Sequence, residues 1–95
     1  MKWQYEAGRI YSKNENNELM AETTFSFACN NRVVVNHTYV NPVLRGQGVA
    51  GKMMEVVAEH FRENGLKANA TCSYAREWFK KHRETYSDIL SEDFE

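Results

Sequence analysis

The side chains best suited to chemistry lie in two short stretches of the chain, one containing His37 and one containing Cys72. Cys72 comes directly before a predicted helix, where the positive end of the helix dipole favours the thiolate over the thiol. A thiolate is a nucleophile, and the neutral imidazole of His37 can accept a proton near pH 7. These residue types predict nucleophilic chemistry assisted by a base.

Both side chains also have structural interpretations, which the sequence leaves open. A single cysteine in a strand is usually a small buried hydrophobe. His37 interrupts a strand that is otherwise apolar on its face, so it is either a base or a core histidine with satisfied nitrogens. The second cysteine, Cys29, adjoins a predicted turn at Asn30 and Asn31 and has only a packing interpretation. Two cysteines are too few for a disulfide framework, so we expect reduced thiols.

A third stretch, residues 44–51, is rich in glycine and lies between a predicted strand and a predicted helix. It contains Gly46, Gly48 and Gly51. In this position small residues expose consecutive backbone N–H groups at the positive end of the helix dipole, and these groups form a phosphate site. The alternative is that the glycines only allow the helix to pack closely against the sheet.

Two phosphate-binding motifs match this stretch in part. Residues 46–52 match the first seven positions of a nucleotide-binding P-loop, but the eighth is Met53, which has no hydroxyl for magnesium. The spacing of Gly46, Gly48 and Gly51 fits the dinucleotide fingerprint, but no acidic residue follows a second strand about twenty positions later. Neither motif is complete.

The elements that must position these residues follow from hydrophobic periodicity. Alternation predicts strands near the N-terminus and at residues 18–29, and apolar residues on both parities predict a more central strand at 32–40. Shorter strands are expected at residues 9–11 and 67–72. One-sided apolar patterns predict a helix at residues 47–64, a second helix through Lys81 with Ser73 as its N-cap, and a short helical turn at 86–90. This order indicates the α+β class, with antiparallel hairpins followed by a strand, a glycine loop, a helix, a strand and a helix. A right-handed crossover must join two parallel strands, and ligands favour the mouth of such a unit.

Length and composition narrow the class further. We assign all 95 residues, 1–95, to one domain, in which 42% hydrophobic and 13% aromatic residues suffice for a core. The net charge of −1 lacks the basic excess that nucleic-acid binding requires, and no apolar run approaches the length of a membrane span. We therefore expect a soluble cytoplasmic protein without nucleic-acid or membrane partners. His37, His60 and His82 share no ligand spacing with a cysteine, so we expect no metal.

Three stretches together resemble the compact, single-domain subgroup of the GNAT superfamily of N-acyltransferases. The matching residues are His37-Thr38-Tyr39-Val40, Arg45-Gly46-Gln47-Gly48-Val49-Ala50 and Cys72-Ser73-Tyr74, with a closing Lys81-His82 and Tyr86. The resemblance covers residues 25–90, most of the chain. It implies a minimal GNAT-like fold, acetyl-CoA as co-substrate and an amine as acceptor, without a metal.

The resemblance also implies where the co-substrate binds. Acetyl-CoA is expected in a V-shaped opening between the strand that ends at Val40 and the strand that ends at Cys72, with a backbone N–H near Val40 holding the oxyanion. The expected contacts are the backbone of Thr38, Tyr39 and Val40 for the pantetheine, the loop Arg45, Gly46, Gln47, Gly48, Val49, Ala50 and Gly51 for the pyrophosphate, and Ser73.

Two catalytic routes follow from the resemblance. Cys72 either accepts the acetyl group as a thioester or orients the acceptor while the amine attacks acetyl-CoA directly. His37 deprotonates the incoming ammonium or activates Cys72. Tyr74 either protonates the departing CoA thiolate or only packs in the apolar stripe of its helix. The alternative to an N-acetyltransferase is a non-catalytic module that binds or senses acyl-CoA, and the sequence identifies no particular acceptor.

Overall fold

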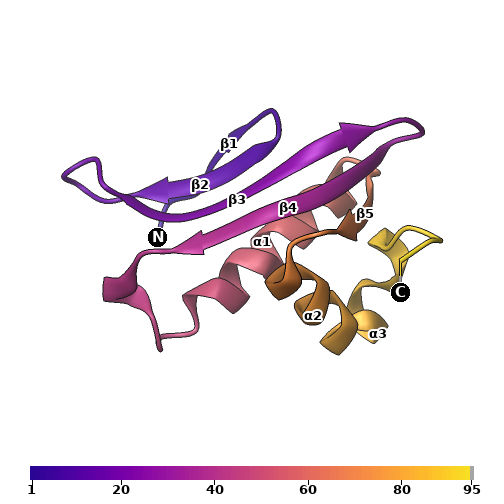
Figure 1. Cartoon of the computed structure of the whole chain (residues 1–95). Helices are drawn as coiled ribbons and strands as arrows, with labels where there is room; N and C mark the ends of the chain where they lie inside the picture. Colours follow the sequence, from indigo (N-terminus) through magenta and orange to yellow (C-terminus); the bar gives the residue numbers. More distant parts are fainter. Residues whose placement is uncertain (95) are drawn as a thin grey trace.

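The computed structural model describes residues 1–94 as a five-stranded mixed sheet with helices along one side (Figure 1). The strands lie side by side in chain order: β1 Gln4–Glu6, β2 Arg9–Lys13, β3 Leu19–Ala28, β4 Arg32–Val40 and β5 Lys67–Ala70. The helices are η1 Pro42–Leu44, α1 Val49–Glu63, α2 Ser73–Lys81, α3 Arg83–Tyr86 and η2 Ser87–Ile89, where η denotes a short 3₁₀ turn. The arrangement confirms the α+β class.

Tight turns make the first four strands antiparallel. Asn30 and Asn31 have positive φ angles of 60° and 57° in the three-residue loop between Ala28 of β3 and Arg32 of β4. Gly8 turns the chain between β1 and β2, and a Cβ there would lie 2.8 Å from the carbonyl oxygen of Phe25. Only glycine fits that position without displacing β3. In contrast, β4 and β5 are parallel and are joined through α1.

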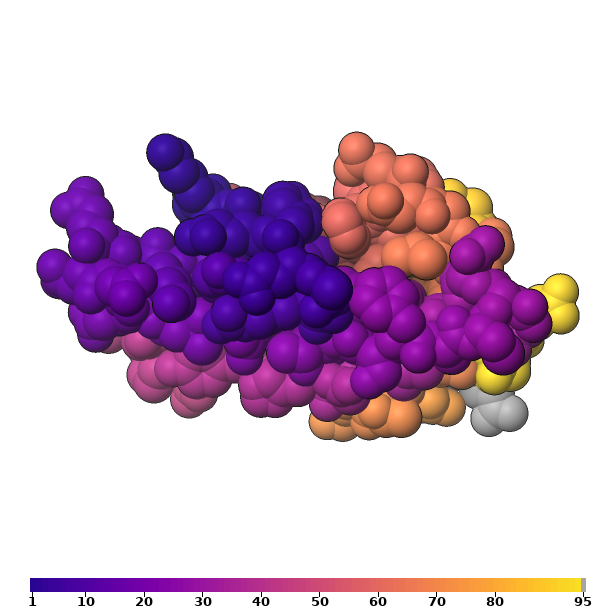
Figure 2. Space-filling model, turned by 90° about the horizontal axis from the view of Figure 1, so that it is seen from above, coloured from indigo at the N-terminus to yellow at the C-terminus, as the bar shows by residue number. Residues whose placement is uncertain are grey.

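The two faces of the sheet have opposite character. Along β3, Ala21 and Phe25 are buried, whereas Glu22 and Ser26 point to the other side and are partly or fully exposed. The helices cover only the first face, which we call the inner face (Figure 1). Among residues 1–94 no helix covers the outer face: seen from above, β1 to β4 spread across it (Figure 2).

A β-bulge at Asn36 interrupts the alternation of β4. Thr24 pairs with His37 and Phe25 pairs with Val35, so Asn36 has no partner of its own. A bulge shifts the alternation by one residue. His37 therefore lies on the outer face, where its side chain is 53% exposed. The expectation that His37 shares the apolar face of its strand was wrong, and it is not a core histidine.

The core lies between the inner face and α1. The helix buries Met53, Met54, Val57, Ala58 and Phe61, as its predicted apolar face requires. The rings of Phe61 and Phe25 meet edge to face with their centroids 5.0 Å apart. The predicted start at residue 47 was too early, because Gly48 has a φ of 73° and caps the helix from outside.

β5 is shorter than predicted. It ends at Ala70 rather than residue 72, because the backbone N–H groups of Thr71 and Cys72 both donate to the Val35 carbonyl, at 2.9 and 3.2 Å. This shared acceptor ends the regular ladder. α2 begins at Ser73, with Ala75, Trp78 and Phe79 buried. The N-cap residue is Cys72 and not Ser73 as predicted, so the helix starts one residue earlier.

The chain beyond α2 returns to the sheet. The predicted helical turn at residues 86–90 is resolved into α3 and η2, which bring Leu90 into a parallel bridge with Ala68 of β5. Arg62 of α1 holds this segment by donating to both carboxylate oxygens of Asp88, at 2.7 and 2.8 Å.

Candidate active site

The two parallel strands separate in the middle of the sheet. Their last pair joins Val35 to Ala70. β4 continues for five residues to Val40, and within residues 1–94 no strand pairs with its free edge there. The chain from β5 instead turns at Cys72 into α2. The backbone of residues 38–40 therefore borders an opening of the expected kind.

A groove of about 310 Å³ occupies this opening. It is lined by Thr38, Tyr39, Val40, Arg45, Ala50, Met53 and Tyr74. All of these except Met53 are among the residues that the sequence predicted for cofactor binding or catalysis. Met53 was assigned only to the core, because an apolar residue on the buried face of a helix carries no polar signal of a site.

The start of α1 adjoins this groove, because both Arg45 and Ala50 line it. The first backbone N–H groups of a helix have no partner within it. Here no side chain caps them, and no acidic residue lies in the first turn. A Cβ at Gly48 would meet no atom within 4 Å. An anion can therefore approach these N–H groups closely.

Other residues predicted to contact the cofactor are not among those that line this groove. Gln47 and Val49 line a second groove, of about 690 Å³, between β1 and α1. Gly51 faces α2, because a Cβ there would lie 3.9 Å from Nε1 of Trp78. Ser73 is exposed as the first residue of α2.

Cys72 is half-buried at the N-terminus of α2, where the strands separate. Its Sγ lies 3.4 Å from Oγ1 of Thr38. Burial raises the pKa of the thiol. Hydrogen bonds from the Thr38 hydroxyl and from the backbone N–H groups of Ala75 and Tyr74 lower the pKa by more than burial raises it, so the pKa is below its usual value. The surroundings thus favour the thiolate, as the start of a helix does in general.

Tyr74 lines the groove two residues after Cys72. It is 41% exposed, unlike the buried Ala75, Trp78 and Phe79 that follow it in the apolar stripe. Tyr74 is therefore not a core residue. Partial burial raises the pKa of its phenol, which keeps the proton on the oxygen at neutral pH.

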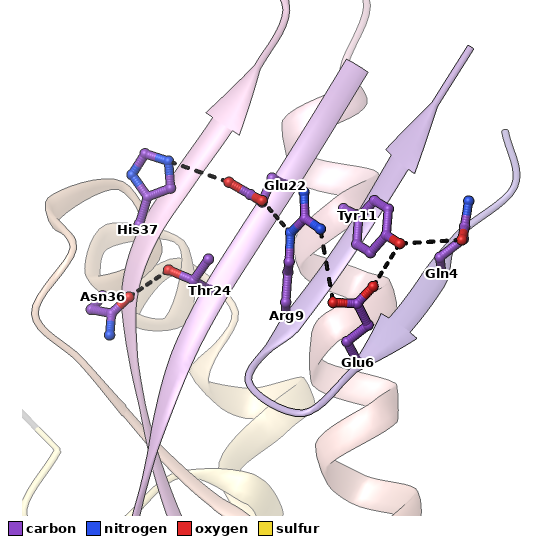
Figure 3. A network of polar contacts seen from close by, with 8 residues as sticks. All are labelled: Gln4, Glu6, Arg9, Tyr11, Glu22, Thr24, Asn36 and His37. Carbon is purple, nitrogen blue, oxygen red and sulfur yellow. Dashed lines mark hydrogen bonds and ion pairs between the residues drawn. The ribbon is translucent and has the colours of Figure 1, made fainter. Parts of the chain in front are cut away.

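His37 lies on the outer face, in a polar network that spans β1 to β4 (Figure 3). Its Nε2 is 3.9 Å from Oε1 of Glu22, which also pairs with Arg9. The bulge places Thr38 on the inner side of the sheet, where its hydroxyl lies against the Cys72 sulfur. The structure therefore does not bring His37 and Cys72 together, and direct activation of the thiol by this imidazole is excluded.

Two further observations concern the described part of the chain. Among residues 1–94, no three His, Cys, Asp or Glu side chains come together in a way that could hold a metal ion. None of the helices in that range is both long and apolar enough to cross a membrane.

Comparison with known proteins identifies the family. The model of the GCN5-related N-acetyl-transferase family matches residues 9–89, a range that includes β4, the glycine loop and Cys72. The chain belongs to this family. Membership confirms the GNAT resemblance of the three sequence motifs and assigns the chain to the acyltransferases.

Solved structures of GNAT proteins agree with the fold. The solution structure of a GCN5-like protein from Staphylococcus aureus is 36% identical and covers 95% of this chain and 87% of its own, with a TM-score of 0.77. Nourseothricin acetyltransferase is 27% identical, with a TM-score of 0.50 over 61% of this chain and 35% of its own. No protein of curated function matches the chain.

One distant relative was solved with a bound co-substrate. A predicted acetyltransferase from Clostridium acetobutylicum, crystallised with acetyl-CoA, is 21% identical to this GNAT chain. The match covers 78% of this chain and 55% of the other, with a TM-score of 0.55, and shows the common fold.

Proposed function

We propose that this GNAT chain is an acetyl-CoA-dependent N-acetyltransferase in which the acetyl group passes through Cys72. The observation that carries the proposal is the continuous groove from the start of α1 to Thr38, which contacts the Cys72 sulfur. One end of this groove suits an anion, and at the other end Thr38 contacts the Cys72 thiol, whose pKa is lowered. The acetyl-CoA bound to a protein of the same fold supports the choice of donor.

The co-substrate fits the groove through backbone groups. The free N–H groups at the start of α1 and the Arg45 guanidinium suit the pyrophosphate of acetyl-CoA. The unpaired edge of residues 38–40 suits the amides of pantetheine, which can bond to it as a further strand does. Ser73 and the backbone of Gln47 to Gly51 complete the proposed contacts.

In the first step the Cys72 thiolate attacks the carbonyl carbon of the acetyl group. A new carbon–sulfur bond forms, and a backbone N–H near Val40 stabilises the oxyanion. The bond from that carbon to the CoA sulfur then breaks, and the electron pair leaves with CoA. Tyr74 donates its phenolic proton to this sulfur, which gives the CoA thiol and an acetyl-Cys72 thioester.

In the second step a neutral amine attacks the thioester. The nitrogen–carbon bond forms, the bond to Sγ breaks, and Cys72 leaves as a thiolate. The proton that the nitrogen loses passes to His37 or to water, and Tyr74 regains a proton from water. His37 suits this role only for an acceptor that approaches from the outer face, where its ring is exposed.

Acetyl-CoA turnover with a panel of primary amines tests this function. CoA release, followed by chromatography, is expected for the native chain and for Cys29→Ser, because Cys29 lies exposed at the β3–β4 turn, away from the groove. Cys72→Ser is expected to lose turnover but to bind CoA normally in calorimetry. Full turnover by Cys72→Ser would contradict the thiol route. CoA binding without turnover for any amine would favour the acyl-CoA-binding module.

A further inference from the structure

The hydroxyl of Thr38 is the side-chain group that the described structure places against the Cys72 sulfur, with Oγ1 and Sγ 3.4 Å apart. Sulfur is larger than oxygen, so this separation is compatible with a hydrogen bond. Beside a thiolate only the hydroxyl can donate, because the ionised sulfur carries no proton. The contact joins two elements that are 34 positions apart in the sequence.

The bulge at Asn36 is what directs this hydroxyl to the thiol. Without the extra residue, strict alternation from Val35 would place position 37 on the inner face and position 38 on the outer face. The bulge reverses this order, so Thr38 faces Cys72 and His37 faces solvent. Threonine is also branched at Cβ, which restricts its χ1 angle and so fixes the direction of the hydroxyl.

The neighbour of Thr38 across the sheet does not compete for its proton. Thr23 of β3 pairs with Thr38 and is fully buried, yet its Oγ1 has no hydrogen-bond partner in the described structure. The Thr38 hydroxyl is therefore free to donate to Sγ. Thr23 also offers a control position, because it has the same side chain on the same face of the adjacent strand.

We propose that Thr38 is a positioning residue for Cys72, whose hydroxyl donates to the thiolate and keeps the sulfur at the opening between β4 and β5. This inference rests on the proposed function for its catalytic meaning, but the hydrogen bond exists independently of acetyl transfer. It is a role of the side chain, in addition to the backbone contacts proposed for Thr38.

Several titratable groups surround this contact and must be considered in any pH measurement. Tyr74 on α2 and Tyr39 on β4 line the adjoining groove, as does Arg45 from the loop before α1. Arg76 of α2 donates to the carbonyl of Ala70 at the end of β5, 3.2 Å away. All of these remain in the variants used below, so a change in the profile reports the Thr38 hydroxyl.

The test is the rate of alkylation of Cys72 by iodoacetamide as a function of pH, measured by peptide mass spectrometry without acetyl-CoA. Thr38→Val is isosteric but lacks the hydroxyl. We expect its profile to move to higher pH and its rate at pH values below the thiol pKa to fall about 10-fold. Thr38→Ser is expected to restore the native profile, and Thr23→Val to leave it unchanged.

A native profile for Thr38→Val would overturn the proposal, as would failure of Thr38→Ser to rescue it. If Thr38→Val does not fold by circular dichroism, Thr38→Ala provides the same test, because it also lacks the hydroxyl. The result is separable from the proposed function. A shifted alkylation profile in a chain that transfers no acetyl group would support the hydrogen bond and refute acetyl transfer.

Discussion

At the scale of residues, the reactive side chains are divided between the two faces of the sheet. Cys72, Thr38 and Tyr74 lie together on the groove side, whereas His37 is exposed on the outer face. A thiol that depends on a hydroxyl and on helix N–H groups needs no imidazole beside it to ionise. The division therefore separates the thiol from the imidazole, and the proposed ionisation of Cys72 does not require His37.

Tyr74→Phe isolates the proposed proton donor. It retains the ring but removes the hydroxyl, so we expect CoA affinity to change little and turnover to fall about 10-fold. This is below the usual effect of a general acid because a thiolate leaves readily. Steady-state turnover and calorimetry measure the two quantities. Equal losses of affinity and turnover would instead assign Tyr74 to binding.

At the scale of elements, periodicity predicted the helices and most strands, because each buries one face. The apolar spacing of α1 and α2 directly identifies Met53, Phe61 and Trp78 as core residues. The bulge at Asn36 could not be predicted this way, because it changes which residues share a face without changing their types. Because of the bulge, His37 lies on the outer face and not on the apolar face where it was expected. The contact between Thr38 and Cys72 could not be predicted for the same reason.

The loop before α1 can be tested with a pair of glycines. Gly48 and Gly65 flank the two ends of α1 with φ angles of 73° and 65°, and a Cβ at either would meet no atom within 4 Å. Replacing either with Ala should destabilise the fold by about 1–2 kcal/mol, because both positions are left-handed. Only Gly48→Ala should also weaken CoA binding, by about 10-fold, because its Cβ fills the space proposed for pyrophosphate.

Denaturation measures the stability of both glycine variants, and calorimetry measures their affinity for CoA. If Gly48→Ala binds CoA as tightly as Gly65→Ala does, the pyrophosphate does not lie on this loop.

The attachment of η2 to α1 predicts a pH dependence of stability. The Arg62 hydrogen bonds hold the pKa of Asp88 below its usual value of 3.8. A carboxyl with a lowered folded pKa stabilises the fold above its unfolded pKa, and this contribution is lost as pH falls through the folded value. Asp88→Asn has no carboxyl to protonate, so we expect it to lack this loss of stability at acid pH. At pH 7 we expect the variant to be less stable by at most about 1 kcal/mol, because the Arg62–Asp88 pair is exposed.

Urea denaturation between pH 2 and pH 7 measures this effect. Glu63→Gln, at the end of the same helix, is the control and should retain the native acid limb. An unchanged acid limb in Asp88→Asn would show that the pair contributes nothing to folding.

At the scale of the whole molecule, one core joins the sheet to the helices, and the other side of the sheet stays open. In the described residues, helices pack only on the inner face (Figure 1). The chain spans 35% and 55% of the two longer acetyltransferases compared above. The outer face is polar where the side chains of Glu22 and His37 face one another (Figure 3).

The shared core predicts a single cooperative unfolding transition. Phe61 is fully buried, and Phe61→Ala should destabilise the fold by about 3–5 kcal/mol. Phe27→Ala is the control, because Phe27 is 59% exposed near the end of β3 and the loss of its ring should cost less than about 1 kcal/mol. Tryptophan fluorescence and far-ultraviolet circular dichroism should report coincident transitions, and separate midpoints would contradict a single core.

The most direct test of the account is the intact mass of the protein after incubation with acetyl-CoA and no acceptor. We predict the addition of one acetyl group, mapped to Cys72, absent from Cys72→Ser and present in Cys29→Ser. Addition of an accepted amine should remove it and yield the acetylated amine. The acetyl-Cys72 route is contradicted if the protein binds acetyl-CoA and acetylates an amine, yet Cys72 never carries the acetyl group and Cys72→Ser retains full activity.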